Sequence, residues 1–101
     1  MNNRSALPKN VRQAFAMLDS LTSHEEKSHF MKQSKSDFVC EQHFGLGLWI
    51  RNNWIYGAED DSCLRMLAGL TKDDVFLEHP DTVSGRFLEK YYDHLKRVAK
   101  G

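Results

Sequence analysis

The chain has 101 residues, of which 41% are hydrophobic and 28% are charged, and its 14 Lys and Arg residues are balanced by 14 Asp and Glu. This composition is that of one soluble globular domain over residues 1–101, with a flexible N-terminus at residues 1–6, and it excludes a disordered chain. The zero net charge argues against a nucleic-acid binder, and no apolar run approaches the ~20 residues of a membrane-spanning helix.

The compartment is predicted from the N-terminus and the cysteines. Residues 1–5 are polar and lead into no apolar segment, so we expect no secretory signal. Cys40 and Cys63 are two lone thiols, whereas small secreted domains usually carry more cysteines at disulfide spacings. We therefore expect both to be buried and reduced in a cytoplasmic protein.

The N-terminal third of the chain has the pattern of two amphipathic helices. After Pro8, apolar residues recur every three or four positions from Val11 to Leu21, which predicts a helix with one apolar face. Ser23 and Glu26 have the spacing of a capping box, which predicts a second short helix ending near residue 33.

Residues 37–56 contain the longest apolar segment, and its hydrophobic residues would cover more than half of a helix circumference. A helix of this kind is usually the buried centre of a small bundle. Gly45 and Gly47 each cost about 1 kcal/mol relative to Ala in a helix, which indicates close approach of a neighbouring group. A strand over residues 44–50 is the alternative.

Two more helices are predicted towards the C-terminus. Acids at residues 60 and 61 indicate a helix start, and Gly69 indicates its end. A single turn follows at residues 71–77. Pro80 and Asp81 then open the last helix, whose apolar residues are spaced by three and four throughout. The sequence therefore predicts an all-α, compact bundle of four to five helices around a buried central helix at about residues 37–56.

Charge is segregated along the chain. Residues 1–40 carry six bases and four acids (+2), residues 41–80 carry three bases and seven acids (−4), and residues 81–101 carry five bases and three acids (+2). The middle acids suit helix capping and solvation. Alternatively, they form an acidic surface that attracts a basic protein, such as a nucleic-acid-degrading toxin. These acids are Glu59, Asp60, Asp61, Asp73, Asp74 and Glu78.

No arrangement of residues specifies catalysis or a cofactor. Cys40 and His43 could supply half of a zinc site, but no second ligand pair has close spacing. No serine lies in a G-x-S-x-G element, and the glycines at 45 and 47 lack the Lys-Ser/Thr ending of a phosphate-binding loop. We expect no metal and no cofactor, and the sequence favours, without requiring, a non-enzymatic protein.

A polar cluster interrupts the apolar segment at Arg51, Asn52 and Asn53. On a helix, one of these three side chains points inward, where it needs a polar partner. Asp81 and Ser84, at the opening of the last helix, are the candidate partners. The cluster is therefore either a structural link between two helices or a ligand site in a cleft between them.

Residues 43–54, HFGLGLWIRNNW, resemble the central motif of a family of small bacterial and phage proteins of unknown function, which reads approximately HFGLGMWIRNNWGLW. Residues 7–9 and residues 79–84 (HPDTVS, against HPDDMS in the family) are similar to its flanking segments. The chain departs from the family at residues 55–57 and at Thr82, which stands where a second acid is usual. The resemblance implies a compact domain whose recurring residues include Arg51, Asn52, Asp81 and Ser84, and it implies no activity, substrate or cofactor.

Three functions follow as hypotheses. The first is a cytoplasmic protein-binding module, most concretely an immunity-type inhibitor that occludes a basic toxin with the acids at 59–78 and an aromatic anchor, Trp54 or Tyr56. The second is a small-molecule-binding or enzymatic domain that uses Arg51, Asn52, Asp81 and Ser84. The third is a nucleic-acid-binding domain, motivated by the bases of the last helix, which are Arg86, Lys90, Lys96, Arg97 and Lys100.

Overall fold

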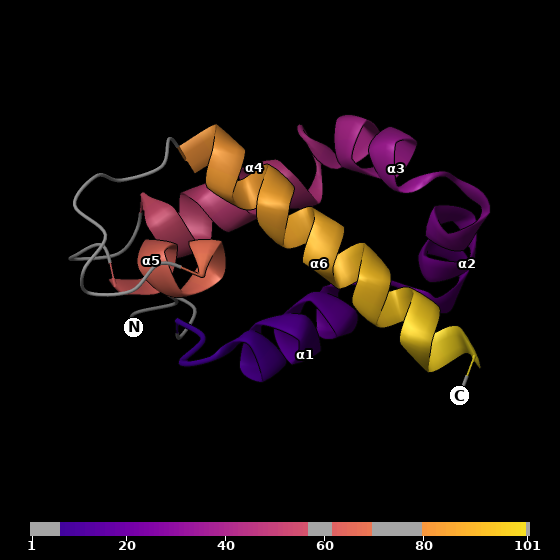
Figure 1. Ribbon diagram of the computed structural model, residues 1–101, viewed down its shortest axis with the longest axis horizontal. Coiled ribbons are helices and arrows are strands. Elements are labelled where there is room, and N and C mark those ends of the chain that lie inside the picture. Colours follow the sequence, from indigo (N-terminus) through magenta and orange to yellow (C-terminus); the bar gives the residue numbers. More distant parts are fainter. Residues whose placement is uncertain (1–6, 57–61, 70–79, 101) are drawn as a thin grey trace.

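The computed structural model describes residues 7–56, 62–69 and 80–100, and this part of the chain is helical with no strand (Figure 1). Its elements are α1 (Val11–Leu21), α2 (His24–Lys32), α3 (Lys35–Gln42), α4 (Leu46–Ile50), the π-helical segment η1 (Arg51–Ile55), α5 (Ser62–Ala68) and α6 (Pro80–Lys100). The all-α prediction is confirmed. The predictions of a flexible segment at 1–6 and a turn at 71–77 lie outside the described residues.

The helix boundaries follow the expected capping chemistry. Ser23 and Glu26 form the predicted capping box, in which the Glu26 backbone N–H donates to Ser23 Oγ (3.1 Å) and the Ser23 N–H donates to Glu26 Oε1 (2.9 Å). The bond from the Ser23 backbone is the main reason that the pKa of the Glu26 carboxyl is lowered. Gly69 follows α5 with φ +75°, the left-handed conformation that favours glycine at a helix end.

The predicted continuous helix over residues 37–56 is wrong, because the chain breaks between α3 and α4 and then changes helix type. Gly45 has φ −103° and ψ −105°, outside the helical range, and the Leu46 N–H is capped by Gln42 Oε1 at 3.1 Å. The alternative of a strand at 44–50 is also wrong, since residues 46–50 form α4. Splitting the predicted helix is also why the described residues contain six α-helices rather than four or five.

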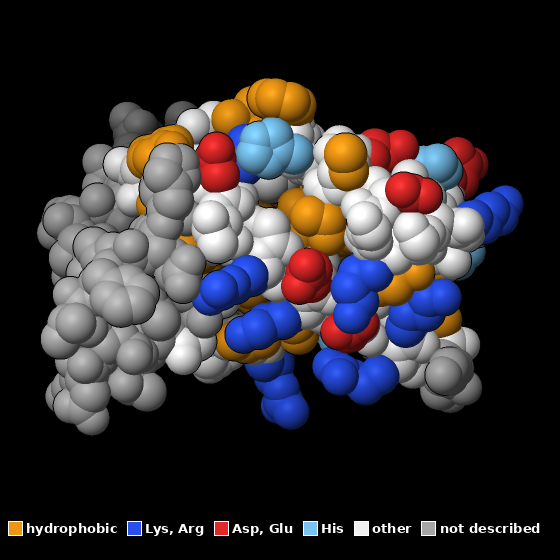
Figure 2. Space-filling model, turned by 45° about the horizontal axis from the view of Figure 1, so that its top comes forward, with side chains coloured by type: hydrophobic (Ala, Val, Ile, Leu, Met, Phe, Trp, Pro, Cys, Tyr) orange, Lys and Arg blue, Asp and Glu red, His pale blue; other side chains and the backbone are white. Residues whose placement is uncertain are grey.

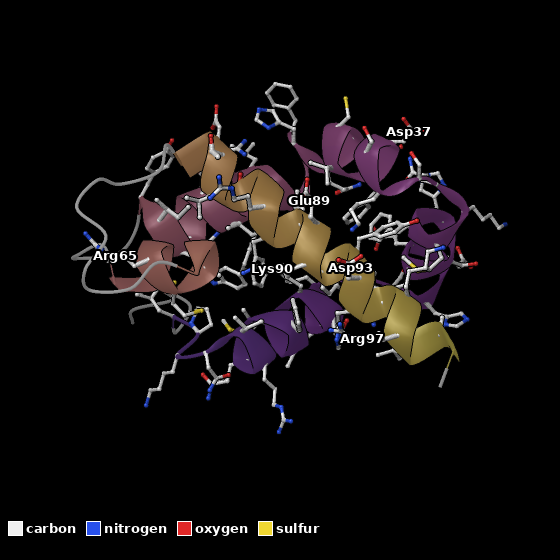
Figure 3. The ribbon with its side chains drawn as sticks, in the orientation of Figure 1. Asp37, Arg65, Glu89, Lys90, Asp93 and Arg97 are labelled. Carbon is white, nitrogen blue, oxygen red and sulfur yellow. The ribbon has the colours of Figure 1, made fainter. Side chains whose placement is uncertain are left out.

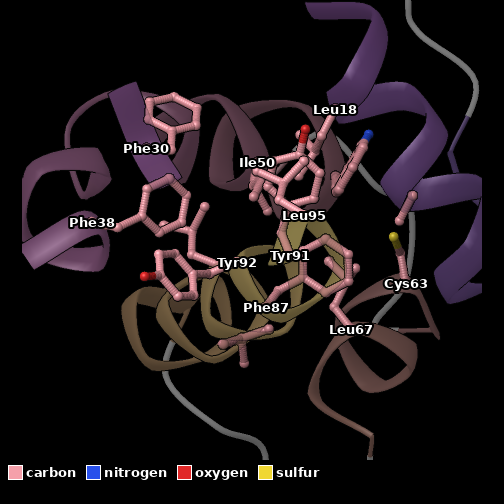
Figure 4. Close-up of a cluster of buried hydrophobic side chains, with 14 residues drawn as sticks. Leu18, Phe30, Phe38, Ile50, Cys63, Leu67, Phe87, Tyr91, Tyr92 and Leu95 are labelled. Carbon is pink, nitrogen blue, oxygen red and sulfur yellow. The ribbon is translucent and has the colours of Figure 1, made fainter. Parts of the chain in front are cut away.

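The central helix of the fold is α6, not the tryptophan-rich segment. α6 crosses the whole molecule in Figure 1, and α2, α3, α4, η1 and α5 all contact it. Its buried face carries the aromatic pair Tyr91 and Tyr92 along with Val83, Phe87, Leu88 and Leu95. Figure 4 shows Phe87, Tyr91, Tyr92 and Leu95 in one apolar cluster with side chains of α1, α2, α3, α4 and α5. The last helix predicted from the sequence is therefore the axis on which the others pack.

The aromatic core brings distant parts of the chain together. Phe38 of α3 lies 4.8 Å from Phe30 of α2 and 5.6 Å from Tyr92 of α6, measured between ring centroids. Phe15 of α1 lies 5.4 Å from Phe87. Aromatic pairs at these separations contribute about 0.5–1.5 kcal/mol each beyond the area that they bury.

Candidate functional site

Arg51 is the polar centre of the region predicted from the sequence, and its side chain is only 4% exposed. One guanidinium nitrogen, Nη1, donates to Ser84 Oγ at 2.9 Å, and Nη2 donates to the backbone carbonyl of His43 at 2.8 Å. Nε lies 3.3 Å from Oδ1 of Asp81. A buried cation requires such partners, because an unpaired one would carry a large desolvation cost.

These contacts make Arg51 a link between three segments of the chain. The sequence-based expectation that Asp81 and Ser84 would be its partners is confirmed. The other two members of the predicted cluster are elsewhere, because Asn52 is exposed and the Asn53 amide donates to the Trp49 carbonyl at 2.9 Å within its own helix. All three guanidinium nitrogens already have protein partners, which is the arrangement of a structural link.

Gly47 allows the segment around Arg51 to lie directly against α6. A Cβ at this position would be 2.9 Å from the Gln42 carbonyl oxygen, 3.2 Å from Arg51 Nη1 and 3.4 Å from Leu88 Cδ1. The space that a side chain would need is therefore occupied from both sides. This is the close approach that the glycine predicted.

The helix widens immediately after this contact. In η1, the Tyr56 N–H donates to the Arg51 carbonyl at 2.7 Å, five residues back rather than four. Single π turns of this kind occur frequently at functional sites. Here the turn lies between a fixed inner face, where Arg51 and Trp54 are buried, and an exposed outer face.

The exposed outer face carries large apolar side chains at intervals of four residues. Phe44 is 78% exposed, Leu48 is 40% exposed and Tyr56 is 61% exposed, with exposed Asn52 between the last two. Leu48 and Asn52 are four residues apart within the helical run 46–55, whereas Phe44 precedes the break at Gly45 and Tyr56 follows the π turn. We call Phe44, Leu48, Asn52 and Tyr56 the aromatic stripe. Figure 2 shows exposed hydrophobic side chains at the upper edge of the molecule, beside a histidine.

The partner-binding residues predicted from the sequence differ in their exposure. Trp54 is wrong as a surface anchor, because its side chain is fully buried against Trp49 and Phe87, with ring centroids 5.2 and 6.1 Å away. Tyr56 is exposed. The acidic residues predicted to contact a partner all lie outside the described part of the chain. The acids concerned are Glu59, Asp60, Asp61, Asp73, Asp74 and Glu78.

Sequence reasoning missed Phe44 and Leu48 as surface residues. It assigned both to a buried helix because the whole segment is apolar. The spacing of Phe44, Leu48 and Tyr56 by multiples of four was the available signal, together with Gly47, which lies on the buried side. Exposure could not be read from hydrophobicity alone.

Both cysteines were predicted to be buried. This is confirmed for Cys63 and wrong for Cys40, which is exposed on α3. Burial raises the pKa of the Cys63 thiol to about 11. Across the described residues, no three His, Cys, Asp or Glu side chains are grouped so that they could hold a metal ion. None of the described helices combines the length and the apolar character required to span a bilayer.

Comparison with known proteins identifies one family. The family model described as "Domain of unknown function (DUF6794)" matches residues 7–95. No curated protein and no solved structure matches the chain. The match covers both the Arg51 link and the aromatic stripe, and the expectation of a family of unknown function is confirmed at that level.

Proposed function

We propose that this chain, which belongs to the DUF6794 family of domains of unknown function, is a protein-binding module that contacts its partner through the aromatic stripe. The observation that carries the proposal is the exposure of Phe44, Leu48 and Tyr56 along residues 44–56. Grouped apolar side chains on a surface typically mark an interaction site, and aromatic residues supply most of the binding energy at such sites.

The segment beneath the stripe is held in place before any partner arrives. Arg51 ties it to the His43 carbonyl and to α6, and Gly47 lies against Leu88. A rigid surface loses little conformational entropy on binding, so more of the contact energy appears as affinity. The Arg51 link supports the stripe from below in this proposal and does not itself contact the partner.

We propose a basic protein as the partner, on the basis of the charge of the sequence around the stripe. The middle of the chain, residues 41–80, has three bases and seven acids, a net charge of −4. Three of those acids, at residues 59–61, follow Tyr56 within five positions of the sequence. Acidic residues beside an aromatic anchor would speed association with a cationic surface. The most concrete form of the proposal is an immunity-type inhibitor that covers the basic active site of a cognate toxin.

The alternative of a ligand site at Arg51, Asn52, Asp81 and Ser84 has less support. The Arg51 nitrogens are occupied by protein groups, and Asn52 is exposed whereas Arg51 is buried. A carboxylate or phosphate would first have to displace those partners.

The test is co-expression of the chain with the products of its neighbouring genes, with binding measured by calorimetry and inhibition measured as survival of cells that produce a toxic product. We expect Phe44→Ala and Tyr56→Ala each to weaken binding by about tenfold or more. Leu21→Ala is the matched control, because Leu21 is an exposed apolar residue of α1 outside the stripe.

Two results would contradict the proposal. One is a partner whose affinity is the same for the stripe variants and for Leu21→Ala. The other is a failure of every neighbouring product to bind. Charge reversal of Glu59, Asp60 and Asp61 tests the nature of the partner separately. If it changes neither the affinity nor its salt dependence while the stripe variants do lose affinity, the aromatic stripe is the contact surface but the partner is not recognised by its basic charge.

A further inference from the structure

A groove of about 480 Å³ lies between α1 and the C-terminal half of α6, away from the aromatic stripe. Phe15 and Ala16 of α1 contribute its apolar part, and Phe15 stacks on the His94 ring with centroids 4.5 Å apart. Arg12 of α1 and Arg97 of α6 line it from the two helices. Figure 3 shows Arg97 on α6 where this helix passes the end of α1.

The acidic group of the groove, Asp19, already has partners. Its Oδ1 accepts a hydrogen bond from the Tyr91 hydroxyl at 2.7 Å and lies 3.5 Å from Lys27 Nζ, and its Oδ2 lies 3.7 Å from His94 Nε2. The charge of this carboxylate is therefore offset within the protein by groups that hold it in place.

The two arginines that line the groove have no polar partner among the described residues. Arg12 and Arg97 make no hydrogen bond and no ion pair with any residue in the described part of the chain. Asp93, the neighbour of His94 in the sequence, pairs with Lys35 of α3 at 2.9 Å and does not line the groove. Two free guanidinium groups thus share one concave surface with an aromatic pair.

We infer that this groove binds a small planar organic anion, a phosphate monoester that carries a flat ring, as in a nucleotide. Guanidinium groups are suited to phosphate because they donate parallel hydrogen bonds to two oxygens, and two of them match a doubly charged group. The volume is in the range of ~300–1,000 Å³ that is usual for small-molecule sites, more than a phosphate ion alone would fill. The Phe15 and His94 rings provide the apolar surface on which the ring of the ligand would lie.

The test uses the intact chain and three probes, adenosine monophosphate, adenosine and inorganic phosphate, with affinities measured by calorimetry or by NMR chemical-shift titration. We expect adenosine monophosphate to bind more tightly than either of the other two. Arg12→Gln and Arg97→Gln should each weaken its binding about tenfold, as loss of a charged hydrogen bond does. Lys32→Gln is the control, because Lys32 is an exposed cation of α2 outside the groove.

Three outcomes would overturn the inference. The first is that none of the probes binds. The second is that adenosine or inorganic phosphate alone binds as tightly as the nucleotide, which would mean that the site does not recognise the phosphate and the ring as parts of one ligand. The third is that Lys32→Gln weakens binding as much as the arginine variants, which would indicate general attraction to a basic surface. Arg12 and Arg97 are exposed, so we expect both variants to fold like the wild type, and circular dichroism of each variant checks this.

Discussion

The hydroxyl of Ser84 lies 2.9 Å from a guanidinium nitrogen of Arg51, across 33 positions of sequence. Ser84 is fully buried in the first turns of α6, and its Oγ also donates to the Asp81 carbonyl at 3.1 Å. The bond therefore joins the start of the central helix to the start of the π-helical segment. Because the aromatic stripe is on the outer side of that segment, the position of the proposed contact surface depends on this buried pair.

Replacing Arg51 by Ala should destabilise the protein by about 2–4 kcal/mol, because the buried Ser84 hydroxyl and the His43 carbonyl lose their partner. Urea denaturation followed by circular dichroism measures the change in the free energy of unfolding. Asn52→Ala is the control, since the neighbouring Asn52 is exposed and its loss should change stability by no more than about 0.5 kcal/mol. Equal effects of the two variants would show that the Arg51 link contributes nothing.

Two glycine variants should have effects of opposite sign. A Cβ at Gly47 would be 2.9 Å from the Gln42 carbonyl oxygen, so Gly47→Ala should destabilise the chain by about 1–3 kcal/mol despite the better helix propensity of Ala. At Gly85 of α6, the nearest atom would be Val39 Cγ1 at 3.8 Å, an ordinary contact. Gly85→Ala should therefore stabilise by up to about 1 kcal/mol. The thermal midpoints of the two variants test the pair, and a gain in stability from Gly47→Ala would refute the close approach.

The stability contributed by Tyr91 should depend on pH. Burial, and then the bond to Asp19, raises the pKa of the Tyr91 phenol well above its usual value. A raised pKa in the folded state gives stability that is complete below the unfolded pKa of about 10 and is lost as the pH rises beyond it. Tyr91→Phe should therefore be about 1 kcal/mol less stable than the wild type at neutral pH, with a difference that shrinks above pH ~10. Urea midpoints of the two proteins across this pH range supply the measurement. A stability difference that grows as the pH rises would contradict the raised pKa of Tyr91.

The two cysteines should differ in reactivity. Cys40 is exposed, whereas Cys63 is buried and its pKa is raised to about 11. Because the thiolate is the reactive form, iodoacetamide at mildly alkaline pH should modify Cys40 first and reach Cys63 only as the chain unfolds. The control is Cys40→Ser, in which only the buried Cys63 remains, so mass spectrometry should show slow labelling of the folded protein. Rapid labelling of Cys63 in the folded protein would contradict its burial.

Local signals in the sequence predicted much of the helical structure. Ser23 with Glu26, Gly69 and Pro80 each mark a boundary that the structure contains, because capping depends on a few neighbouring residues. The pairing of Arg51 with Asp81 and Ser84 was also predictable, since a buried cation needs an acid or a hydroxyl within reach.

Which helix lies at the centre could not be predicted from hydrophobicity. Residues 37–56 are more apolar than α6, yet Phe44, Leu48 and Tyr56 are exposed. The chain breaks at Gly45, and Gly47 lies close to Leu88 of α6, a tertiary contact that hydrophobicity along the sequence does not indicate. The groove beside Arg12 and Arg97 was missed for a similar reason, because it exists only where two helices far apart in the sequence pass each other.

The central position of α6 has a consequence for synthesis on the ribosome. Each described helix that packs on α6 precedes it in the chain, so their apolar faces lack the surface that covers them until residues 83–95 have emerged from the exit tunnel. Folding of this domain therefore waits until α6 has emerged, and nascent Phe30, Phe38 and Trp54 remain accessible to chaperones during that interval.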